Sequence, residues 1–392
     1  MNNAVIVSAC RTPIGTFMGG LSPLSAPKLG AIAIEEAIRR AGIQKTDVQE
    51  VILGNVLVAG EGQAPARQAA LFAGLPVSVE CMTINKVCGS GLKAVMLATQ
   101  AIRLGDADVI VAGGMESMSN TPYLLEKGRE GYRLGHGKVL DSMIRDGLWD
   151  VYNDFHMGNA AEICAKECNI PRDAQDEFAV LSYTRAQRAW EEGRFKEEVF
   201  PVTIPGRQGD TIIDKDEEPF KANFEKMKKL KPAFQQDGTV TAANASKIND
   251  GAAAVIVMSE ARAAASGLKP IARIIEYASA AKKPEWFTTA PVDAITKVLS
   301  KSNLKKEEID LFEINEAFAV VALAVNKSLG LDLNLVNVNG GAVALGHPIG
   351  ASGSRILVTL LHALKQNNKK RGLAAICIGG GEASAMIVEM GS

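Results

Sequence analysis

Histidine and cysteine, the residues most often found in metal centres and disulfide frameworks, are sparse in this sequence. Only four histidines occur among the 392 residues, and none follows a cysteine pair at zinc-finger spacing. The six cysteines are scattered along a long chain, which excludes a disulfide framework. Cys164 and Cys168 have the i, i+4 spacing of one helix face, and we expect them to be small core residues. The sequence therefore predicts no metal site.

Long apolar runs and an excess of one sign of charge are also missing. No stretch of about 18 apolar residues is present, so no membrane span is predicted. The net charge is -1, so no basic field attracts nucleic acid or anionic lipid. The first residues, MNNAVIVSACRTPIG, resemble neither a secretion signal nor a transit peptide, and the final EMGS is no targeting tail. We expect a cytoplasmic protein that binds neither nucleic acid nor a membrane.

Short apolar runs alternate with helical patterns in the first part of the chain. A length of 392 residues also predicts two or three domains rather than one core. This alternation is typical of parallel βαβ units with helices on both faces of a sheet, and it predicts the α/β class. Strands are expected at 3–9, 50–57, 80–87 and 108–114, and helices at 25–41, 63–73 and 91–104.

The C-terminal part repeats this scheme. Strands are expected at 311–315, 334–340 and 373–381, and helices at 317–329 and 353–365. The repeat also shows in the letters, because 110–116 (IVAGGME) lines up with 376–382 (ICIGGGE). A Ser-Gly pair opens the long helix of each half, at Ser90 and at Ser352. We therefore expect a duplicated domain packed on itself.

Between the halves, residues 120–247 are richer in charge and in glycine and proline. We expect a long excursion laid over the first half, with one helix at 171–191, because such excursions often cover a substrate. The apolar run 249–260 then provides the last strand of the first half. The expected domains are a first half (1–119 plus 248–270), an inserted loop domain (120–247) and a second half (271–392).

The stretch 85–95, NKVCGSGLKAV, places Cys88 directly before a predicted helix. Unpaired N–H groups and the helix dipole favour negative charge there, so the site is expected to lower the pKa of the thiol and make it a nucleophile. Gly89 and Gly91 allow a tight turn and the close approach of a ligand. The alternative is a buried structural cysteine.

The same stretch also fits the G-x-G-x-x-A spacing of a dinucleotide-binding loop. That reading requires an acidic residue about 20 positions on, at the end of the next strand. Asp106 and Asp108 precede that strand instead. The sequence thus gives little support to a nicotinamide cofactor.

Three further polar positions fall at strand ends or glycine-rich loops of the second half. His347 lies in the loop 340–354, Cys377 is followed by three glycines after a strand residue, and Asn315 follows the strand LFEI. Strand ends and helix N-termini form the reactive edge of a parallel sheet. We therefore expect Cys88, His347 and Cys377 to converge. Asn315 could instead cap the next helix.

Two cysteines and one histidine at one edge suggest a division of labour. A thiolate can hold an acyl group as a thioester, a histidine can activate that thiol, and the second cysteine can act as acid or base. Glycine N–H groups can hold the oxyanion of a thioester carbonyl. This set fits the making or breaking of a carbon–carbon bond beside a thioester, without metal or redox cofactor.

Several long motifs resemble the thiolase family, in the family's order and across essentially the whole chain. They are VIVSACRTPIGTFMG, NKVCGSGLKAV, GGMESMSN, HMGNAAE, NASKINDGAAA, EINEAFA, NVNGGAVALGHPIGASGSR and CIGGGEASA. The resemblance implies a thiolase fold of two similar βαβαβαββ halves, which form a five-layered α-β-α-β-α core with an inserted loop domain. It also implies a homotetramer that needs no cofactor and takes coenzyme A thioesters as substrates.

The resemblance also implies a role for each residue of the reactive edge. Cys88 is expected to be acylated, and His347 to activate it and to help bind the thioester oxygen. Cys377 is expected to remove the α-proton of the second acyl-CoA. Asn315 would hold a water that completes one oxyanion hole with His347, and the N–H groups of Cys88 and Gly379 would form the other.

Substrate contacts are carried over in the same way. The motif HMGNAAE resembles the short-chain branch, in which His156 and Met157 line the site. Ser246 would touch the pantetheine arm of coenzyme A. Lys221 stands beside the place where many relatives have an arginine for the nucleotide, and Lys247 stands where a small residue is common. Apolar walls for coenzyme A are expected from Leu148, Phe234, Phe287 and Phe318.

The expected reaction is the Claisen condensation of two acetyl-CoA to acetoacetyl-CoA and CoA, and its reverse, through an acyl-cysteine. One alternative is a degradative 3-ketoacyl-CoA thiolase of broader chain length. A second is a ketoacyl synthase-like condensing enzyme, against which the second cysteine, Cys377, argues. A third is a non-catalytic scaffold that binds coenzyme A, which would not need Cys88, His347 and Cys377 together.

Overall fold

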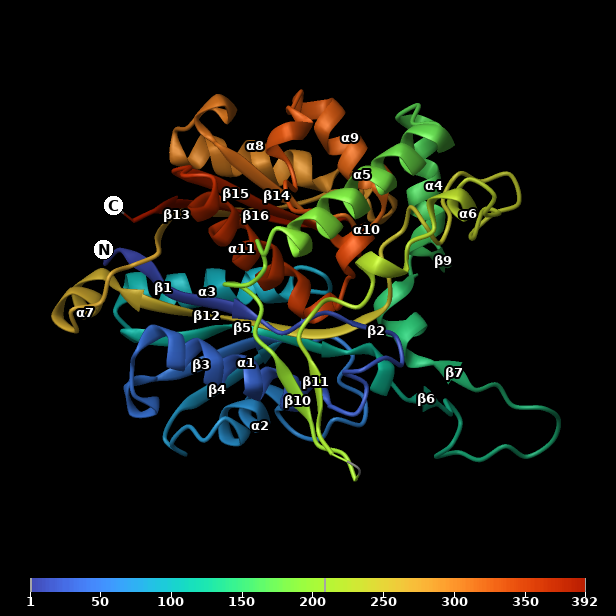
Figure 1. Cartoon of the computed structure of the whole chain (residues 1–392). Helices are drawn as coiled ribbons and strands as arrows, with labels where there is room; N and C mark the ends of the chain where they lie inside the picture. The colour runs from blue at the N-terminus through green and yellow to red at the C-terminus, as the bar shows by residue number, and fades with distance from the viewer. Residues whose placement is uncertain (1, 208, 392) are drawn as a thin grey trace.

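Two layers of β-strands and three layers of helices stack in the core, as seen in the computed structural model, which describes residues 2–207 and 209–391 (Figure 1). The ten core strands form one hydrogen-bonded sheet, and its two layers are called here the first and the second sheet. The first sheet contains β1 (Ala4–Arg11), β2 (Gly15–Thr16), β3 (Glu50–Gly54), β4 (Glu80–Ile84), β5 (Val109–Ser117) and β12 (Asn249–Ser259). The second contains β13 (Ala272–Ala281), β14 (Leu311–Ile314), β15 (Arg371–Ile378) and β16 (Glu382–Met390).

The helices occupy the outer faces and the centre of this stack. Helices α1 (Ala26–Ala41) and α2 (Pro65–Phe72) cover the first sheet, and α8 (Ala290–Ser302) covers the second (Figure 1). Helices α3 (Ser90–Leu104) and α11 (Ile349–Gln366) lie between the sheets and contact each other. This is the predicted five-layered core of two similar halves. Among the described residues, no helix combines the length and apolar character that crossing a membrane requires.

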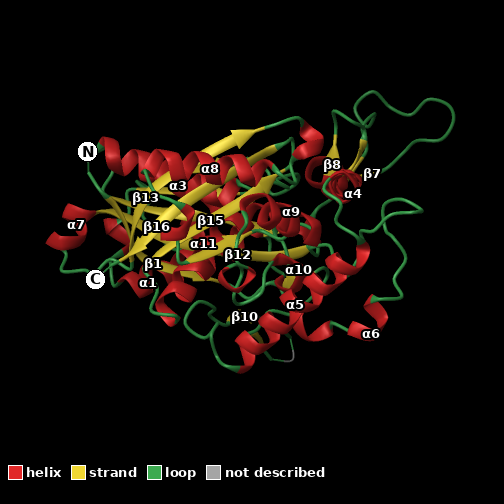
Figure 2. Ribbon diagram, turned by 90° about the horizontal axis from the view of Figure 1, so that it is seen from above, coloured by secondary structure: helices red, strands yellow, loops and turns green. Residues whose placement is uncertain are grey.

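The pairing of the strands is mixed rather than wholly parallel. Strands β3, β4 and β5 are parallel, as are β14 and β15, in agreement with the predicted βαβ units. Strands β12 and β16 pair antiparallel with their neighbours. A short antiparallel bridge between β1 and β13, at Val5–Arg273 and Ile6–Ala272, joins the two sheets. The two termini consequently lie at the same end of the molecule (Figures 1 and 2).

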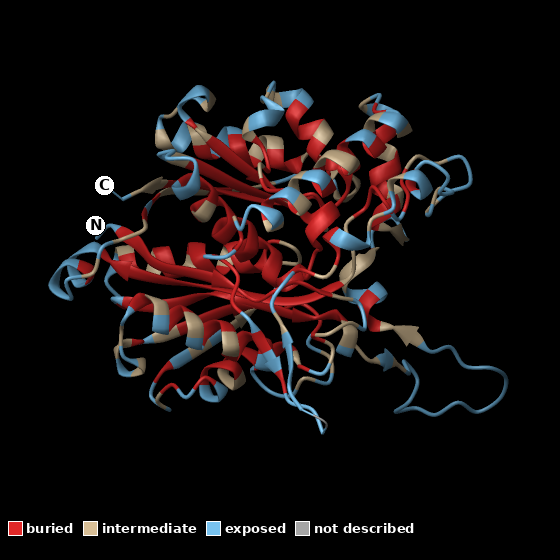
Figure 3. Cartoon of the chain, viewed as in Figure 1, coloured by how far each residue is buried: buried red, intermediate tan, exposed pale blue. Residues whose placement is uncertain are grey.

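The repeated Ser-Gly pairs mark the point where the two central helices touch. A Cβ atom on Gly91 of α3 would lie 2.7 Å from the backbone nitrogen of Ser354, and one on Gly353 of α11 would overlap the backbone of Leu92. Glycine is therefore required at both positions for the two backbones to approach. Almost every residue of α11 is buried (Figure 3). Each buried leucine of that helix contributes about 1.5–3 kcal/mol to stability.

The strand predicted at 334–340 is wrong. This segment holds only a short 3-10 turn and one isolated bridge, between Phe312 and Val336. Asn337 has a left-handed backbone (φ 47), which interrupts an extended strand. Its side-chain amide bonds both the N–H and the C=O of Ile314, at 2.8 Å each, and so replaces the missing ladder bonds of β14.

Besides a π-helix (Met143–Leu148) and a 3-10 turn (Pro219–Lys221), the inserted segment carries two α-helices, one short α-helical turn and three small hairpins. They are β6 (Tyr123–Leu124), β7 (Leu140–Asp141), β8 (Trp149–Asp150), β9 (Phe155–His156), α4 (Met157–Glu167), α5 (Arg172–Glu191), β10 (Val202–Ile204), β11 (Thr211–Ile213) and α6 (Phe224–Met227). The prediction that this segment lies over the first half covers only part of its packing. The hairpin β10–β11 packs on the first half, whereas α5 packs on α9 (Ala319–Leu329) and α10 (Ala342–Leu345) of the second. A short helix, α7 (Glu260–Ala265), follows β12.

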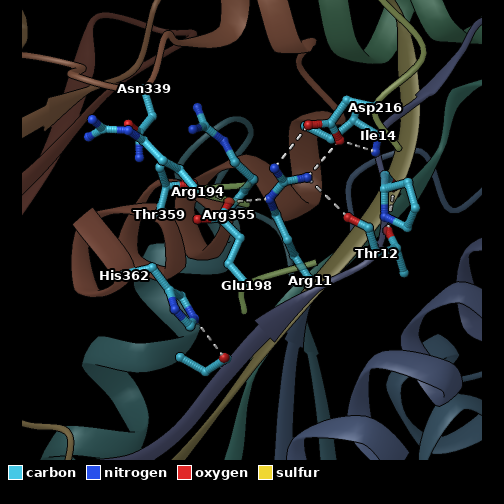
Figure 4. A network of polar contacts seen from close by, with 12 residues as sticks. Arg11, Thr12, Ile14, Arg194, Glu198, Asp216, Asn339, Arg355, Thr359 and His362 are labelled. Atoms are coloured by element: carbon cyan, nitrogen blue, oxygen red, sulfur yellow. Dashed lines mark hydrogen bonds and ion pairs between the residues drawn. The ribbon is translucent and has the colours of Figure 1, made fainter. Parts of the chain in front are cut away.

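A buried ionic network fixes the inserted segment to the core (Figure 4). The Arg11 guanidinium on β1 donates to Glu198 at 2.5 Å and to both oxygens of Asp216 at 2.7 and 3.0 Å. Glu198 also accepts from Thr359 on α11. Buried charges require such pairing, because each unpaired ion costs several kcal/mol. The network thus ties three distant parts of the chain together.

Candidate active site

Cys88 lies in a strained turn that immediately precedes α3. Val87 has a left-handed backbone (φ 47), which is rare for a β-branched residue. The turn is held by hydrogen bonds from Val87 N to Asn85 Oδ1 (2.9 Å) and from Ser90 Oγ to Val87 O (2.6 Å). These hydrogen bonds fix the turn that carries Cys88. The Cys88 side chain is partly exposed.

The end of β15 reaches the same turn from the other half of the protein. A Cβ on Gly89 would overlap the side chain of Ile378, so only glycine admits this approach. A Cβ on Gly379 would lie 3.5 Å from Val87. The third approach comes from the start of α11, because Ile349 packs in one small cluster with Cys88. The strand end that carries Cys377 and the start of α11, two residues after His347, thus both approach the Cys88 turn.

The expectation that the helix start lowers the pKa of Cys88 is wrong for the resting protein. Burial raises the pKa of this thiol to about 11, and the N–H groups of Gly379 and of Cys88 itself only partly oppose this effect. Cys88 is therefore a neutral thiol at rest and requires a base to become a nucleophile.

His347 has the protonation state that such a base needs. It is buried, and burial with the nearby positive charge of Arg355 lowers its pKa to about 3, so the imidazole is neutral. Nδ1 lies 2.6 Å from Ser352 Oγ, whose hydroxyl donates to Pro348 O at 2.8 Å. Nδ1–H is therefore the donor to Ser352, which leaves Nε2 with its lone pair. Nε2 has no hydrogen-bond partner among the described residues.

Replacing His347 by asparagine is expected to remove about 2 kcal/mol of acid destabilisation between pH 7.5 and pH 5. The folded pKa of about 3 lies below the ordinary value of 6.5, so the unfolded chain binds the proton more tightly in this interval. Native stability therefore falls as pH drops through 6.5. Urea unfolding of both proteins at both pH values measures the difference. An equal loss in the native and variant proteins would contradict it, and the exposed His136→Asn change is the control.

Cys377 is the second thiol of the site and lies near the end of β15. It is 1% exposed, and burial raises its pKa well above the usual value. A negative charge on Cys88 raises it further, which places the two sulfurs near each other. The N–H groups of Cys377 itself and of Ala317 oppose this shift. The resting site thus holds two neutral thiols and one neutral imidazole.

Asn315 follows β14 and is 1% exposed. Its backbone N–H donates to Ala375 O at 2.9 Å, which fixes it beside β15. The side-chain amide has no hydrogen-bond partner among the described residues, so it does not cap α9, and Phe318 holds the cap position instead. A buried amide with free donor and acceptor atoms is suited to bind a polar ligand or a water.

An aromatic wall lies beside Cys377. His156 stacks on Phe234 with ring centroids 4.7 Å apart, and Phe318 meets Phe234 edge-on at 6.1 Å. Met157 belongs to the same cluster and lies against Gly379. Phe287 is only 2% exposed and packs on Phe318 at 6.3 Å, so it supports the wall from behind rather than lining it.

Of the other predicted substrate contacts, Leu148 and Ser246 lie near the candidate site, whereas Lys221 lies on a surface turn. Leu148 packs in the small cluster that contains Cys88. Ser246 donates its backbone N–H to Ala317 O at 3.0 Å, next to Phe318. Lys221 belongs to a surface turn, 3.9 Å from the Glu218 carboxylate, and no described contact joins it to the aromatic wall.

Sequence reasoning missed the residues that orient the catalytic loops. Asn249 Oδ1 accepts the backbone N–H of His347 at 2.9 Å, and Ser352 fixes its tautomer. Glu116 accepts three backbone N–H groups, including that of Gly350, and is fully buried. Its aligned partner Glu382 instead pairs with Lys86 and is partly exposed. The sequence repeat therefore predicts that Glu116 and Glu382 occupy equivalent positions, but their side chains have different roles.

Metal chemistry finds no site here. Within residues 2–207 and 209–391, no group of three or more histidine, cysteine, aspartate or glutamate side chains is arranged to hold a metal ion. Cys164 and Cys168 lie 3.8 Å apart, sulfur to sulfur, on α4.

Two family models match the chain almost end to end. "Thiolase, N-terminal domain" matches residues 4–261, and "Thiolase, C-terminal domain" matches residues 268–390. The chain belongs to the thiolase family. The predicted family and fold are therefore confirmed.

Acetyl-CoA acetyltransferases are among the proteins similar to this chain. An acetyl-CoA acetyltransferase of Cupriavidus necator is 56% identical over 391 residues, covering 99% of this chain and 100% of the relative. A mitochondrial acetyl-CoA acetyltransferase of Bos taurus is also 56% identical, covering 99% and 92%.

Two solved structures have the same fold over their whole length. The Bacillus anthracis acetyl-CoA acetyltransferase has a TM-score of 0.98 and 44% identity, covering 100% of this chain and 99% of that one. A thiolase of Ascaris suum in complex with coenzyme A has a TM-score of 0.94 and 46% identity, covering 99% and 100%.

Proposed function

We propose that this protein is an acetyl-CoA acetyltransferase, which condenses two acetyl-CoA to acetoacetyl-CoA and CoA and catalyses the reverse thiolysis. The observation that carries the proposal is that the Cys377 strand end and the start of α11, next to a neutral His347, both approach the Cys88 turn. Relatives that bear this name match nearly the whole chain, and one related structure holds coenzyme A. The substrates are therefore coenzyme A thioesters, and no separate cofactor is required.

In the first half-reaction, His347 Nε2 takes the proton of Cys88 as the sulfur attacks the acetyl carbonyl. The N–H groups of Cys88 and Gly379 stabilise the oxyanion that forms. The C–S bond to coenzyme A breaks, and the Cys377 thiol protonates the departing sulfur. The products are acetyl-Cys88, free CoA, an imidazolium at His347 and a thiolate at Cys377.

The second half-reaction uses this ion pair. The Cys377 thiolate removes the α-proton of a second acetyl-CoA, while His347 Nε2–H and a water on Asn315 hold the thioester oxygen. The enolate attacks the acetyl carbonyl of Cys88 and forms the carbon–carbon bond. The C–S bond to Cys88 breaks, and His347 returns its proton to that sulfur. Both thiols and the imidazole are then neutral again.

Short substrates are expected to be favoured, because Met157, Phe234 and Phe318 already fill the space beside Cys377. We expect kcat/KM for thiolysis to be about ten- to a hundredfold higher for acetoacetyl-CoA than for 3-oxooctanoyl-CoA, since overpacking costs about 1–3 kcal/mol. Parallel assays with both substrates measure this ratio. Met157→Ala should narrow it by enlarging the pocket. Equal rates in the unchanged protein would favour the broader degradative thiolase.

We also infer a homotetramer in the cytoplasm. Support for the assembly comes from the 121–141 hairpin, which extends away from the core (Figure 1). It exposes an unusual number of large apolar side chains: Tyr123, Leu125, Tyr132, Leu134 and Val139. Such a group on a projecting arm favours contact with another subunit.

A further inference from the structure

Lys247 has an environment that is rare for a lysine. Its Nζ lies 2.7 Å from the carbonyl oxygen of Ala245 and 3.5 Å from that of Val343. It also lies over the ring of Tyr183, 5.7 Å from the centroid. In the described part of the chain, no carboxylate lies within 4.0 Å of this ammonium. The charge is thus held by carbonyl dipoles and an aromatic face instead of an ion pair.

The three contacts come from three different segments. Ala245 belongs to the loop that carries Ser246, and that loop is bonded to the 317–319 segment through Ser246 N–Ala317 O (3.0 Å). Val343 belongs to α10, which ends directly before the His347 loop. Tyr183 belongs to α5 of the inserted segment. The Lys247 ammonium therefore contacts three parts of the protein. They are the loop of Ser246, the helix before His347, and α5 of the inserted segment.

The surrounding charges favour this arrangement. Val343 donates its backbone N–H to Glu316 at 3.1 Å, which holds this residue in place while its carbonyl oxygen faces Lys247. Glu218 is the acidic group that acts on Lys247 from the facing turn. Burial, with the charges of Glu218 and Glu316, raises the pKa of Tyr183, which therefore stays neutral.

We infer that Lys247 is a positioning residue: its ammonium clamps the Ala245–Ser246 loop to α10 and so fixes coenzyme A and His347 relative to each other. This inference rests on the proposed function. A lysine that merely filled space would act equally well without its charge. The clamp requires the proton of the Lys247 ammonium, whereas filling space does not. The two roles therefore predict different dependences of activity on pH.

Burial lowers the pKa of Lys247 to about 8, against the opposing charge of Glu218. The clamp is therefore present at pH 7 and is lost above about pH 8. The effect on stability has the opposite sign, because the unfolded chain binds this proton more tightly than the folded one. The charged lysine thus lowers stability at neutral pH while it supports activity.

The test compares the full-length protein with Lys247→Met, which keeps the apolar stem and removes the charge. At pH 7 we expect kcat/KM for CoA in acetoacetyl-CoA thiolysis to fall about ten- to a hundredfold. The native-to-variant ratio should then shrink toward one at pH 9.5, because other titrating groups are common to both proteins. The melting temperature should be unchanged or higher. Lys269→Met, at an exposed lysine, is the matched control.

Calorimetric titration with CoA provides a readout that does not depend on turnover, and Lys247→Met should bind CoA more weakly at pH 7 only. A variant with native kcat/KM, or a ratio that does not change with pH, would overturn the inference. A variant whose melting temperature falls together with its activity would also overturn the inference. Absence of thiolysis in the native protein would instead overturn the proposed function, so the two failures are distinguishable.

Discussion

Replacing Cys88 by alanine is expected to lower the rate of acetoacetyl-CoA thiolysis at least about 10⁴-fold. The proposed acyl-enzyme cannot form without this sulfur, and Cys377 is not expected to substitute, because burial raises the pKa of its thiol well above the usual value. The fold should be unaffected, since Cys88 is partly exposed and lies in a turn held by its neighbours. Activity and stability are therefore expected to separate cleanly in this variant.

Mass spectrometry of the acetyl-CoA formed measures this rate, and the intact mass of the protein reveals an acetyl group on native Cys88. Cys81→Ala is a suitable control, because Cys81 is also partly buried but lies on β4, beside Arg67. Appreciable turnover in Cys88→Ala would contradict the proposed nucleophile. It would then favour a reaction that uses a different nucleophile.

Cys377→Ala is expected to divide the reaction into its two halves. Transfer of acetyl from acetyl-CoA to Cys88 needs Cys377 only to protonate the departing sulfur, and free CoA or solvent can supply that proton. Removal of the α-proton has no such substitute. We therefore expect thiolysis and condensation to fall about 10²–10⁴-fold, the usual contribution of a general acid or base.

Exchange of isotopically labelled CoA into acetyl-CoA reports the first half-reaction alone, and we expect the variant to retain it within about tenfold. The variant should also accumulate acetyl-Cys88, visible in its intact mass. Cys164→Ala, a buried cysteine of α4, is the control for loss of a core thiol. Loss of exchange and condensation in the same proportion would assign Cys377 to the first step instead.

Much of the fold was predictable because its signals are local and repeated. Alternating apolar runs, helix starts and the two Ser-Gly pairs each depend on a few neighbouring residues. The role of the Ser-Gly pairs was not predictable. They allow α3 and α11 to cross closely, and this crossing brings Gly91 against Ser354, which is 263 positions away in the sequence. The false strand at 334–340 failed for a related reason: Asn337 replaces ladder bonds with side-chain bonds, which periodicity does not register.

The candidate site was predictable as a set of positions but not as a set of protonation states. Glycine-rich motifs indicated Cys88, His347 and Cys377, and the structure places the end of β15 and the start of α11 against the Cys88 turn. The pKa of Cys88 was misjudged, because the local helix start favours the thiolate, whereas the burial comes from side chains that are distant in the sequence, such as Leu57, Leu148 and Ile349. The same limit hid Ser352 and Asn249, whose roles depend on the orientation of His347.

The bridge between β1 and β13 has a practical consequence for handling the protein. It brings both chain ends to one side, where Gly391 bonds Ile271 beside the start of β1. Strand β15 runs antiparallel to the nine-residue β16, so Cys377 lies near the far end of that strand, about 30 Å from the C-terminus. A fused tag, a fluorophore or a surface attachment at either end should therefore leave the substrate path free.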